Sequence, residues 1–446
     1  MEMPMSPIEL AVILGLIGLM GLESLIALRS RSWVQVYRPT LFVAVVLAFY
    51  ALVGPLRAIL STGEAANFVG TTGTIYRGID HRSFLIWGWL GALVFYGSLL
   101  IGFYATKPKI KPFMAMKAAN LSRIRFFGSC LCWFGLAMFL IPNGGRVINL
   151  LNPLNPQGFS ISQFGFSGFN VGAFENYFQL SINFLIPGIL IQFTAWLRQR
   201  KNLASILAWT LLALLIFLSE SFRYRILLLV IPMLLLWMFY NKQRPKLVFL
   251  LVFMVAFVGL NGVIGLSRTS IRGLDLSRLS EETPVSIFNS SFEEAGVFFT
   301  TSAVIESVPE EIPFVGFKPL STALLQPLPR KLFPNKPSGE YSNRLREQIY
   351  QSKVSFTAYL NYAEYYIIGG WLSLVTISIF LGVLLRRLWT WFLWRQYEPL
   401  AQSVYLLNAS YLYVVVSRGY FPQVIMLYGL TVMPLVFIYY ILSERV

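Results

Sequence analysis

The sequence contains few charged residues. Asp, Glu, Lys and Arg together make up 13% of its 446 residues, whereas 56% are hydrophobic. A soluble globular chain carries about 25% charged residues. The low charge, combined with long apolar runs, excludes a water-soluble enzyme, a disordered chain and a small disulfide-rich module.

Acids and histidine are also scarce, and this limits the chemistry. Asp80 and Asp275 are the only aspartates, and His81 is the only histidine. These counts argue against a paired-aspartate metal site and against a histidine metal cluster, and a Ser-His-Asp triad would have to use His81, which has no motif around it. The sequence has no GxxxxGK[ST] loop, so ATP-driven transport has no support. We therefore expect neither a metal nor another cofactor.

Apolar runs dominate what remains. A helix that crosses the hydrocarbon core needs about 20 apolar residues, and eleven segments approach or exceed that length. They predict an all-α, polytopic membrane protein that forms a single membrane domain over residues 1–446. The predicted spans are 7–28, 39–60, 83–104, 126–142, 173–196, 203–219, 226–240, 247–266, 365–385, 399–416 and 421–441.

The net charge of +16 lies entirely on one side of this map. The short connections after the odd-numbered spans, with the C-terminus, carry nineteen Lys and Arg against three acids, whereas the other side carries seventeen of each sign. Basic residues accumulate in cytoplasmic loops. The pattern places the N-terminus outside and the C-terminus in the cytoplasm, and it explains the basic balance without nucleic acid as a partner.

Two predicted outer segments are long. The shorter of the two is a loop at 143–172, and the larger is a loop at 267–364 between the eighth and ninth spans. Loops of that size are uncommon unless they are functional. Within the large loop, the spacing of apolar residues over 282–307 predicts an amphipathic helix, and the proline-rich stretch 311–337 predicts extended turns.

Thirteen arginines and four lysines lie on the outer side, several of them at span ends. A guanidinium group stays charged and binds phosphate oxygens in a bidentate fork, so such a cluster is suited to a lipid-linked phosphate or pyrophosphate. Many of these residues could instead be solvated or ion-paired, and Arg57 could extend to the head groups. Arg223 and Arg225, in a very short connection, and Arg418 in Ser417–Tyr420 are the strongest functional candidates.

Glu364, at the start of a predicted span, is the candidate among the acids. It could act as a base, orient an arginine or form a plain ion pair. Gly369 and Gly370 follow it and predict close helix packing.

Four short segments together resemble the bacterial O-antigen polymerase family, whose members polymerise oligosaccharide repeat units in the membrane. They are Phe222–Arg225, Leu328–Pro337, Ser355–Gly370 and Ser417–Tyr420. With the span number, the orientation and the late outer loop, the resemblance covers about residues 200–446, and the first 200 residues match only in hydropathy.

The resemblance implies a metal-independent glycosyltransferase of the membrane-embedded, GT-C-like class in the bacterial inner membrane. Its substrates would be undecaprenyl-pyrophosphate-linked oligosaccharides at the outer leaflet, for O-antigen or exopolysaccharide synthesis, with membrane lipids and a chain-length regulator as further partners. We assign Arg223, Arg225, Arg418 and Glu364 to catalysis. The expected substrate-binding residues are Arg57, Arg268, Arg272, Arg330, Lys336 and Arg344.

Other readings remain open. The related O-antigen ligases use a histidine in the large outer loop, and loop 267–364 has none. A transporter or flippase of lipid-linked sugars would share an arginine-lined cavity, but its usual inverted repeats or paired broken helices are not evident in the sequence. A non-catalytic scaffold does not explain arginines at span ends. The sequence leaves open the sugar, the linkage, the stereochemical outcome and the oligomeric state.

Overall fold

A computed structural model describes most of the predicted membrane domain. The described residues are 6–30, 32–56, 84–107, 121–143, 175–220, 223–243, 259–260, 262–264, 283, 290–325, 328 and 358–442. All regular secondary structure in these ranges is helical. This confirms the all-α prediction for the part of the chain that is described.

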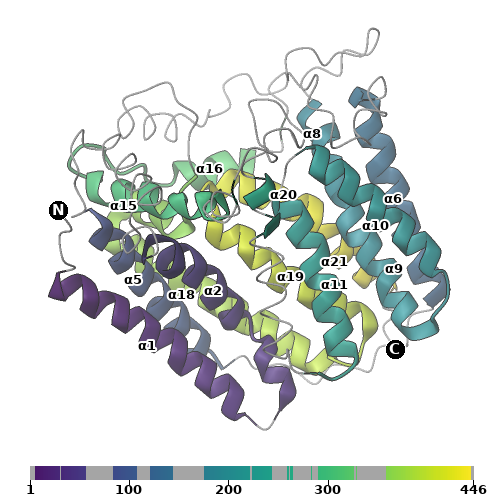
Figure 1. The fold of residues 1–446 in the computed structure, drawn as a ribbon, viewed down its shortest axis with the longest axis horizontal. Helices are drawn as coiled ribbons and strands as arrows, with labels where there is room; N and C mark the ends of the chain where they lie inside the picture. Colours follow the sequence, from purple (N-terminus) through teal and green to yellow (C-terminus); the bar gives the residue numbers. More distant parts are fainter. Residues whose placement is uncertain are drawn as a thin grey trace.

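Nine helices in the described ranges are long and apolar enough to cross a membrane, so the chain is a multi-pass membrane protein (Figure 1). They are α1 (Pro7–Arg29), α2 with its π-helical extension η2 (Pro39–Ala48, Phe49–Val53), α5 (Leu85–Ala105), α6 (Leu121–Asn143), α8 to α9 (Glu175–Leu180, η6 Ser181–Phe184, Leu185–Gln199), α11 (Arg223–Tyr240), α18 (Asn361–Arg395), α19 (Pro399–Ser417) and α20 with α21 (Phe421–Thr431, Met433–Leu442).

Two of the eleven predicted spans are not among these nine. The span predicted at 203–219 is present as α10 (Leu203–Ser219), an apolar helix of only 17 residues. Most of the span predicted at 247–266 lies outside the described residues. The number eleven therefore stays a prediction.

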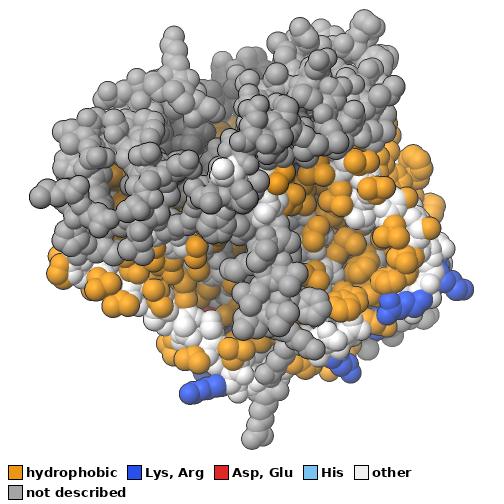
Figure 2. All heavy atoms as spheres, viewed as in Figure 1, with side chains coloured by type: hydrophobic (Ala, Val, Ile, Leu, Met, Phe, Trp, Pro, Cys, Tyr) orange, Lys and Arg blue, Asp and Glu red, His pale blue; other side chains and the backbone are white. Residues whose placement is uncertain are grey.

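The surface of the bundle has the character expected of a protein in lipid. On the face shown in Figure 2, hydrophobic side chains form a broad band, and the described Lys and Arg side chains lie at its lower edge. α1 contributes exposed apolar side chains along its length, such as Ile8 and Leu28. In contrast, almost every side chain of α19 is buried. α1 therefore lies at the periphery of the bundle and α19 at its centre.

Glycine allows α5 and α18 to form the most extensive helix contact in the described part of the chain. A methyl group on Gly102 of α5 would lie 2.1 Å from the Ile379 carbonyl oxygen of α18, and one on Gly382 would lie 2.1 Å from the Leu99 carbonyl oxygen. The two backbones therefore touch at both positions. Small residues permit this approach, and close packing is a main source of helix association in lipid.

Two predictions for the large outer loop, one of a helix and one of extended turns, need correction. The segment at 282–307 was predicted to be an amphipathic helix, and the structure describes residues 283 and 290–307 of it. There α15 spans Val297–Ser307 and is buried on nearly all sides, packed against α5 and α18. The stretch 311–337 was predicted to be extended, yet Lys318–Leu325 forms α16. Pro319 is in the first turn of α16, where a missing N–H costs no helical hydrogen bond, so the proline there does not prevent a helix.

Candidate functional site

The structure joins two segments that the sequence singled out. The Gly419 N–H, in the turn between α19 and α20, donates to the Tyr359 carbonyl oxygen at 2.7 Å. A methyl group on Gly419 would lie 2.3 Å from Tyr359 Cδ2 and 2.9 Å from the Leu360 carbonyl oxygen. Only glycine permits this approach, so the turn that carries Arg418 is held directly against the start of α18.

Glu364 forms a second link between the same two segments. Its carboxylate accepts a hydrogen bond from the Phe421 backbone N–H at 2.7 Å, and the side chain is 1% exposed. Phe421 is the first residue of α20, whose initial N–H groups have no partner within the helix. A carboxylate at this position also complements the positive end of the helix dipole. Glu364 therefore holds the start of α20.

Tyr359, just before α18, is completely buried beside this junction. Burial raises the pKa of its hydroxyl well above the usual value, and the nearby Glu364 and Tyr420 add to the effect. Tyr359 is therefore a neutral hydroxyl at any working pH. Sequence reasoning did not select it, because one tyrosine among 22 carries no distinguishing pattern.

The structure places Arg225, one of the predicted catalytic residues, beside an acid. It is 1% exposed, forms an ion pair with Glu220, and its guanidinium carbon lies 5.9 Å from the Phe217 ring centroid and 5.7 Å from that of Tyr224. A buried cation needs such a partner, because desolvation of an unpaired charge costs several kcal/mol. Arg225 therefore already has a carboxylate beside it.

Arg223 is also buried at the start of α11, and α11 packs against α19. Arg418 follows the last residue of α19 and is half-buried. The structure thus places Arg223 and Arg225 at the start of α11 and Arg418 just after the neighbouring helix α19. The predicted substrate-binding residues lie outside the described residues; they are Arg57, Arg268, Arg272, Arg330, Lys336 and Arg344.

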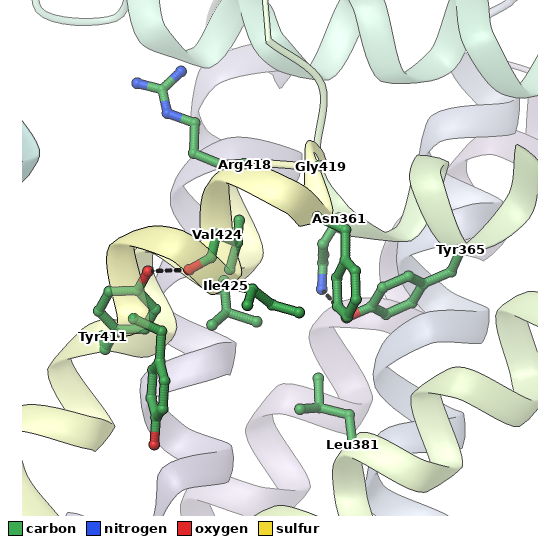
Figure 3. A pocket seen from close by; sticks show the side chains of 11 residues that line it. Asn361, Tyr365, Leu381, Tyr411, Arg418, Gly419, Val424 and Ile425 are labelled. Carbon is green, nitrogen blue, oxygen red and sulfur yellow. Dashed lines mark hydrogen bonds between the residues drawn. The ribbon is translucent and has the colours of Figure 1, made fainter. Parts of the chain in front are cut away.

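A cavity of about 190 Å³ lies between α18, α19 and α20. Leu381, Val415, Val424 and Ile425 give it aliphatic walls, and Arg418 and Gly419 lie at its edge. Figure 3 shows the Arg418 side chain extending away from the cavity, although its backbone borders it. The cavity interior is therefore mainly apolar.

The polar groups around the cavity are mostly satisfied. The Tyr411 hydroxyl donates to the Val424 carbonyl oxygen at 2.6 Å, and the Tyr428 hydroxyl donates to Asn408 Oδ1 at 2.7 Å. Asn361 Nδ2 donates to the Tyr365 hydroxyl at 3.3 Å (Figure 3), but its Oδ1 is buried with no hydrogen-bond partner. Asn361 therefore lines the cavity but keeps its own carbonyl oxygen buried.

Gly369 and Gly370, which were expected to permit close helix packing, interrupt α18, with φ/ψ of −173°/37° and 72°/−155°. Only glycine readily adopts the second conformation. The break leaves carbonyl groups without helical partners, and two of them are satisfied from elsewhere: Ser373 Oγ donates to the Tyr365 carbonyl oxygen at 2.5 Å, and the Val315 N–H donates to that of Ile367 at 2.9 Å.

Within the described ranges, no group of three or more His, Cys, Asp or Glu side chains is placed to hold a metal ion. Comparisons with protein-family models, with curated proteins and with solved structures found no match to this chain.

Proposed function

We propose that the protein is a membrane glycosyltransferase of GT-C-like architecture that polymerises undecaprenyl-pyrophosphate-linked oligosaccharide repeat units. It would work at the outer leaflet of the bacterial inner membrane, with the N-terminus outside and the C-terminus cytoplasmic. The observation that supports this most is the junction of Glu364 with the turn between α19 and α20. Two segments that carry the resemblance, 57 residues apart at this contact, meet at one end of the bundle beside a cavity.

In the proposed reaction, the terminal hydroxyl of an incoming repeat unit attacks the anomeric carbon of the growing glycan. A new glycosidic bond forms, the bond to the lipid pyrophosphate breaks, and the hydroxyl proton passes to a base. Charge builds up on the departing pyrophosphate, so preorganised cations lower the barrier. Arg418 and Arg223 are assigned to this role.

The contacts refine the other two assignments. Arg225 is paired with Glu220, so in this mechanism it positions the start of α11 and adds positive potential rather than gripping the pyrophosphate alone. Glu364 is bound to a backbone N–H, and it would accept a proton only through its remaining acceptor capacity.

The direct test is reconstitution of the purified chain in proteoliposomes with a lipid-linked repeat unit. A ladder of longer glycans is expected from the native chain. Arg418→Gln should lower the rate by about a hundredfold, as the loss of one transition-state contact does. The matched control is Arg29→Gln, an exposed arginine at the end of α1, which should leave the ladder unchanged. Unaltered substrate length with the native chain would rule out the polymerase.

One observation favours a second candidate, a transporter of lipid-linked sugars. α18 is broken at Gly369–Gly370, and discontinuous helices commonly form the substrate sites of transporters. The same proteoliposomes distinguish the two functions, because a transporter moves the substrate between leaflets without elongating it.

A further inference from the structure

The basic edge of the bundle holds a group of cations that form no ion pair with the acidic residues of the described ranges. Arg198 lies in the last turn of α9, Arg200 is its C-cap and Lys201 follows, all three exposed. Lys242 lies just beyond α11, which packs against α9. In the described part of the chain, the ion pairs involve Arg38, Arg225 and Arg395 only. The four positive charges at the ends of α9 and α11 are therefore available to an external anion.

Two of these cations are held in place by aromatic rings. The Arg198 guanidinium carbon lies 4.9 Å from the Tyr240 ring centroid. That of Arg200 lies 4.6 Å from the Trp196 centroid and 6.0 Å from the Tyr240 centroid. Stacking on a ring orients a guanidinium group through the ring quadrupole and leaves the N–H donors at its edge unused. Tyr240 thus brings both guanidinium groups to one place.

The backbone fixes the same arrangement. Arg200 has a φ of 55°, in the left-handed region, and its N–H donates to the Trp196 carbonyl oxygen at 2.7 Å. This conformation ends α9 and reverses the chain into α10 within three residues. Arg200 is therefore anchored at both its backbone and its side chain.

An exposed apolar face begins next to these cations. Leu203, Leu207 and Leu211 of α10 are 43%, 59% and 60% exposed. Their spacing of four residues puts them on one face of the helix, and the first of them is only three residues after Arg200. A molecule with a phosphate at the cations and a hydrocarbon chain along α10 would contact both features.

We propose that Arg198 and Arg200, stacked on Trp196 and Tyr240, bind the phosphate of an anionic phospholipid whose acyl chain lies along Leu203, Leu207 and Leu211. Guanidinium groups form strong charge-assisted hydrogen bonds with phosphate oxygens, and basic sites between helices at the cytoplasmic side are suited to anionic head groups. The apolar face distinguishes a lipid from a free phosphate ion. This site is independent of the glycosyltransferase proposal.

Native mass spectrometry of the full chain in detergent tests the site, with titration of phosphatidylglycerol and of phosphatidylcholine. The native chain should bind phosphatidylglycerol more tightly. The double variant Arg198→Gln/Arg200→Gln should weaken that binding by about thirtyfold, since each basic residue near the head groups contributes about 1 kcal/mol. The matched control is Arg29→Gln/Arg387→Gln, which removes the same charge from two other exposed arginines and should leave the affinity unchanged.

Three outcomes would overturn the proposal. Equal loss in both double variants would mean that net charge alone attracts the lipid. Equal affinity for the two lipids in the native chain would exclude an anion site. Displacement of phosphatidylglycerol by an equal concentration of inorganic phosphate would show that the apolar face contributes nothing. If the double variant does not fold, Tyr240→Leu keeps both charges but removes the shared ring, and it should weaken phosphatidylglycerol binding by about fivefold.

Discussion

The Glu364 carboxylate of α18 accepts a hydrogen bond from the backbone N–H of Phe421, the first residue of α20, at 2.7 Å. This contact and the Gly419–Tyr359 hydrogen bond together fix the turn that carries Arg418. A structural role and a catalytic role for Glu364 therefore make different predictions.

Glu364→Gln keeps an acceptor for the Phe421 N–H but removes the charge. We expect its thermal unfolding midpoint to stay close to that of the native chain, whereas Glu364→Ala should lose about 1–3 kcal/mol of stability because a buried donor loses its acceptor. If Glu364 is the base, the glutamine variant should fold normally and fail to elongate a lipid-linked glycan. Full activity of that variant would restrict Glu364 to a structural role.

Gly419→Ala should destabilise the junction. The new methyl group would lie 2.3 Å from the Tyr359 ring, so the turn or the ring must move, at a cost of about 1–3 kcal/mol. The matched control is Gly429→Ala in α20, where a methyl group meets nothing within 4 Å. The control should be neutral or slightly stabilising. Thermal unfolding in detergent measures both, and equal midpoints would contradict the close approach.

The Arg225–Glu220 pair is suited to a double-mutant cycle. Arg225→Gln and Glu220→Gln should each cost about 3–5 kcal/mol, since each removes one partner of a buried ion pair. The double variant should recover most of that loss. Additive losses, measured by chemical unfolding, would show that the two side chains do not depend on each other.

The break in α18 depends on Ser373, whose hydroxyl donates to the carbonyl groups of Tyr365 and Gly370. Ser373→Ala should lower stability by about 1–2 kcal/mol, because a buried carbonyl oxygen loses its donor. Thr376→Val on the same helix is the control. The Thr376 hydroxyl is exposed and donates only to carbonyl oxygens of its own helix, so the unfolding midpoint of that variant should not change.

Glu398, in the connection between α18 and α19, predicts a pH effect. Burial raises the pKa of its carboxyl above the ordinary value, and the nearby Arg395 partly opposes this. In the unfolded chain this carboxyl has a pKa of about 4.3. The folded chain therefore keeps the proton to a higher pH than the unfolded chain does. As the pH rises from the unfolded pKa to the folded pKa of Glu398, this group makes the protein less stable.

Glu398→Gln cannot titrate, so it should flatten the dependence of the unfolding midpoint on pH from about pH 4.3 upward. Glu310→Gln, which replaces an exposed acid, should keep the slope of the native chain. A steeper slope in Glu398→Gln would mean that the carboxyl pKa shifts in the opposite direction.

The sequence alone determined the spans and the asymmetry of charge. A helix that crosses hydrocarbon must satisfy its own backbone and present about 20 apolar residues, so length and composition reveal it without knowledge of its neighbours. Nine of the predicted spans follow from that rule. The same rule does not predict α15, which is short and buried by other helices rather than by lipid.

Tertiary structure decided which polar groups meet. The sequence identifies Glu364, Arg225 and Gly370 as residues of interest. It does not show that Glu364 lies against α20, that Arg225 pairs with Glu220, or that Gly370 ends a helical segment. Each of these outcomes depends on which helices are neighbours and how closely their backbones approach. That is set by the packing of the whole bundle, whereas a span is set by its own residues and the thickness of the bilayer.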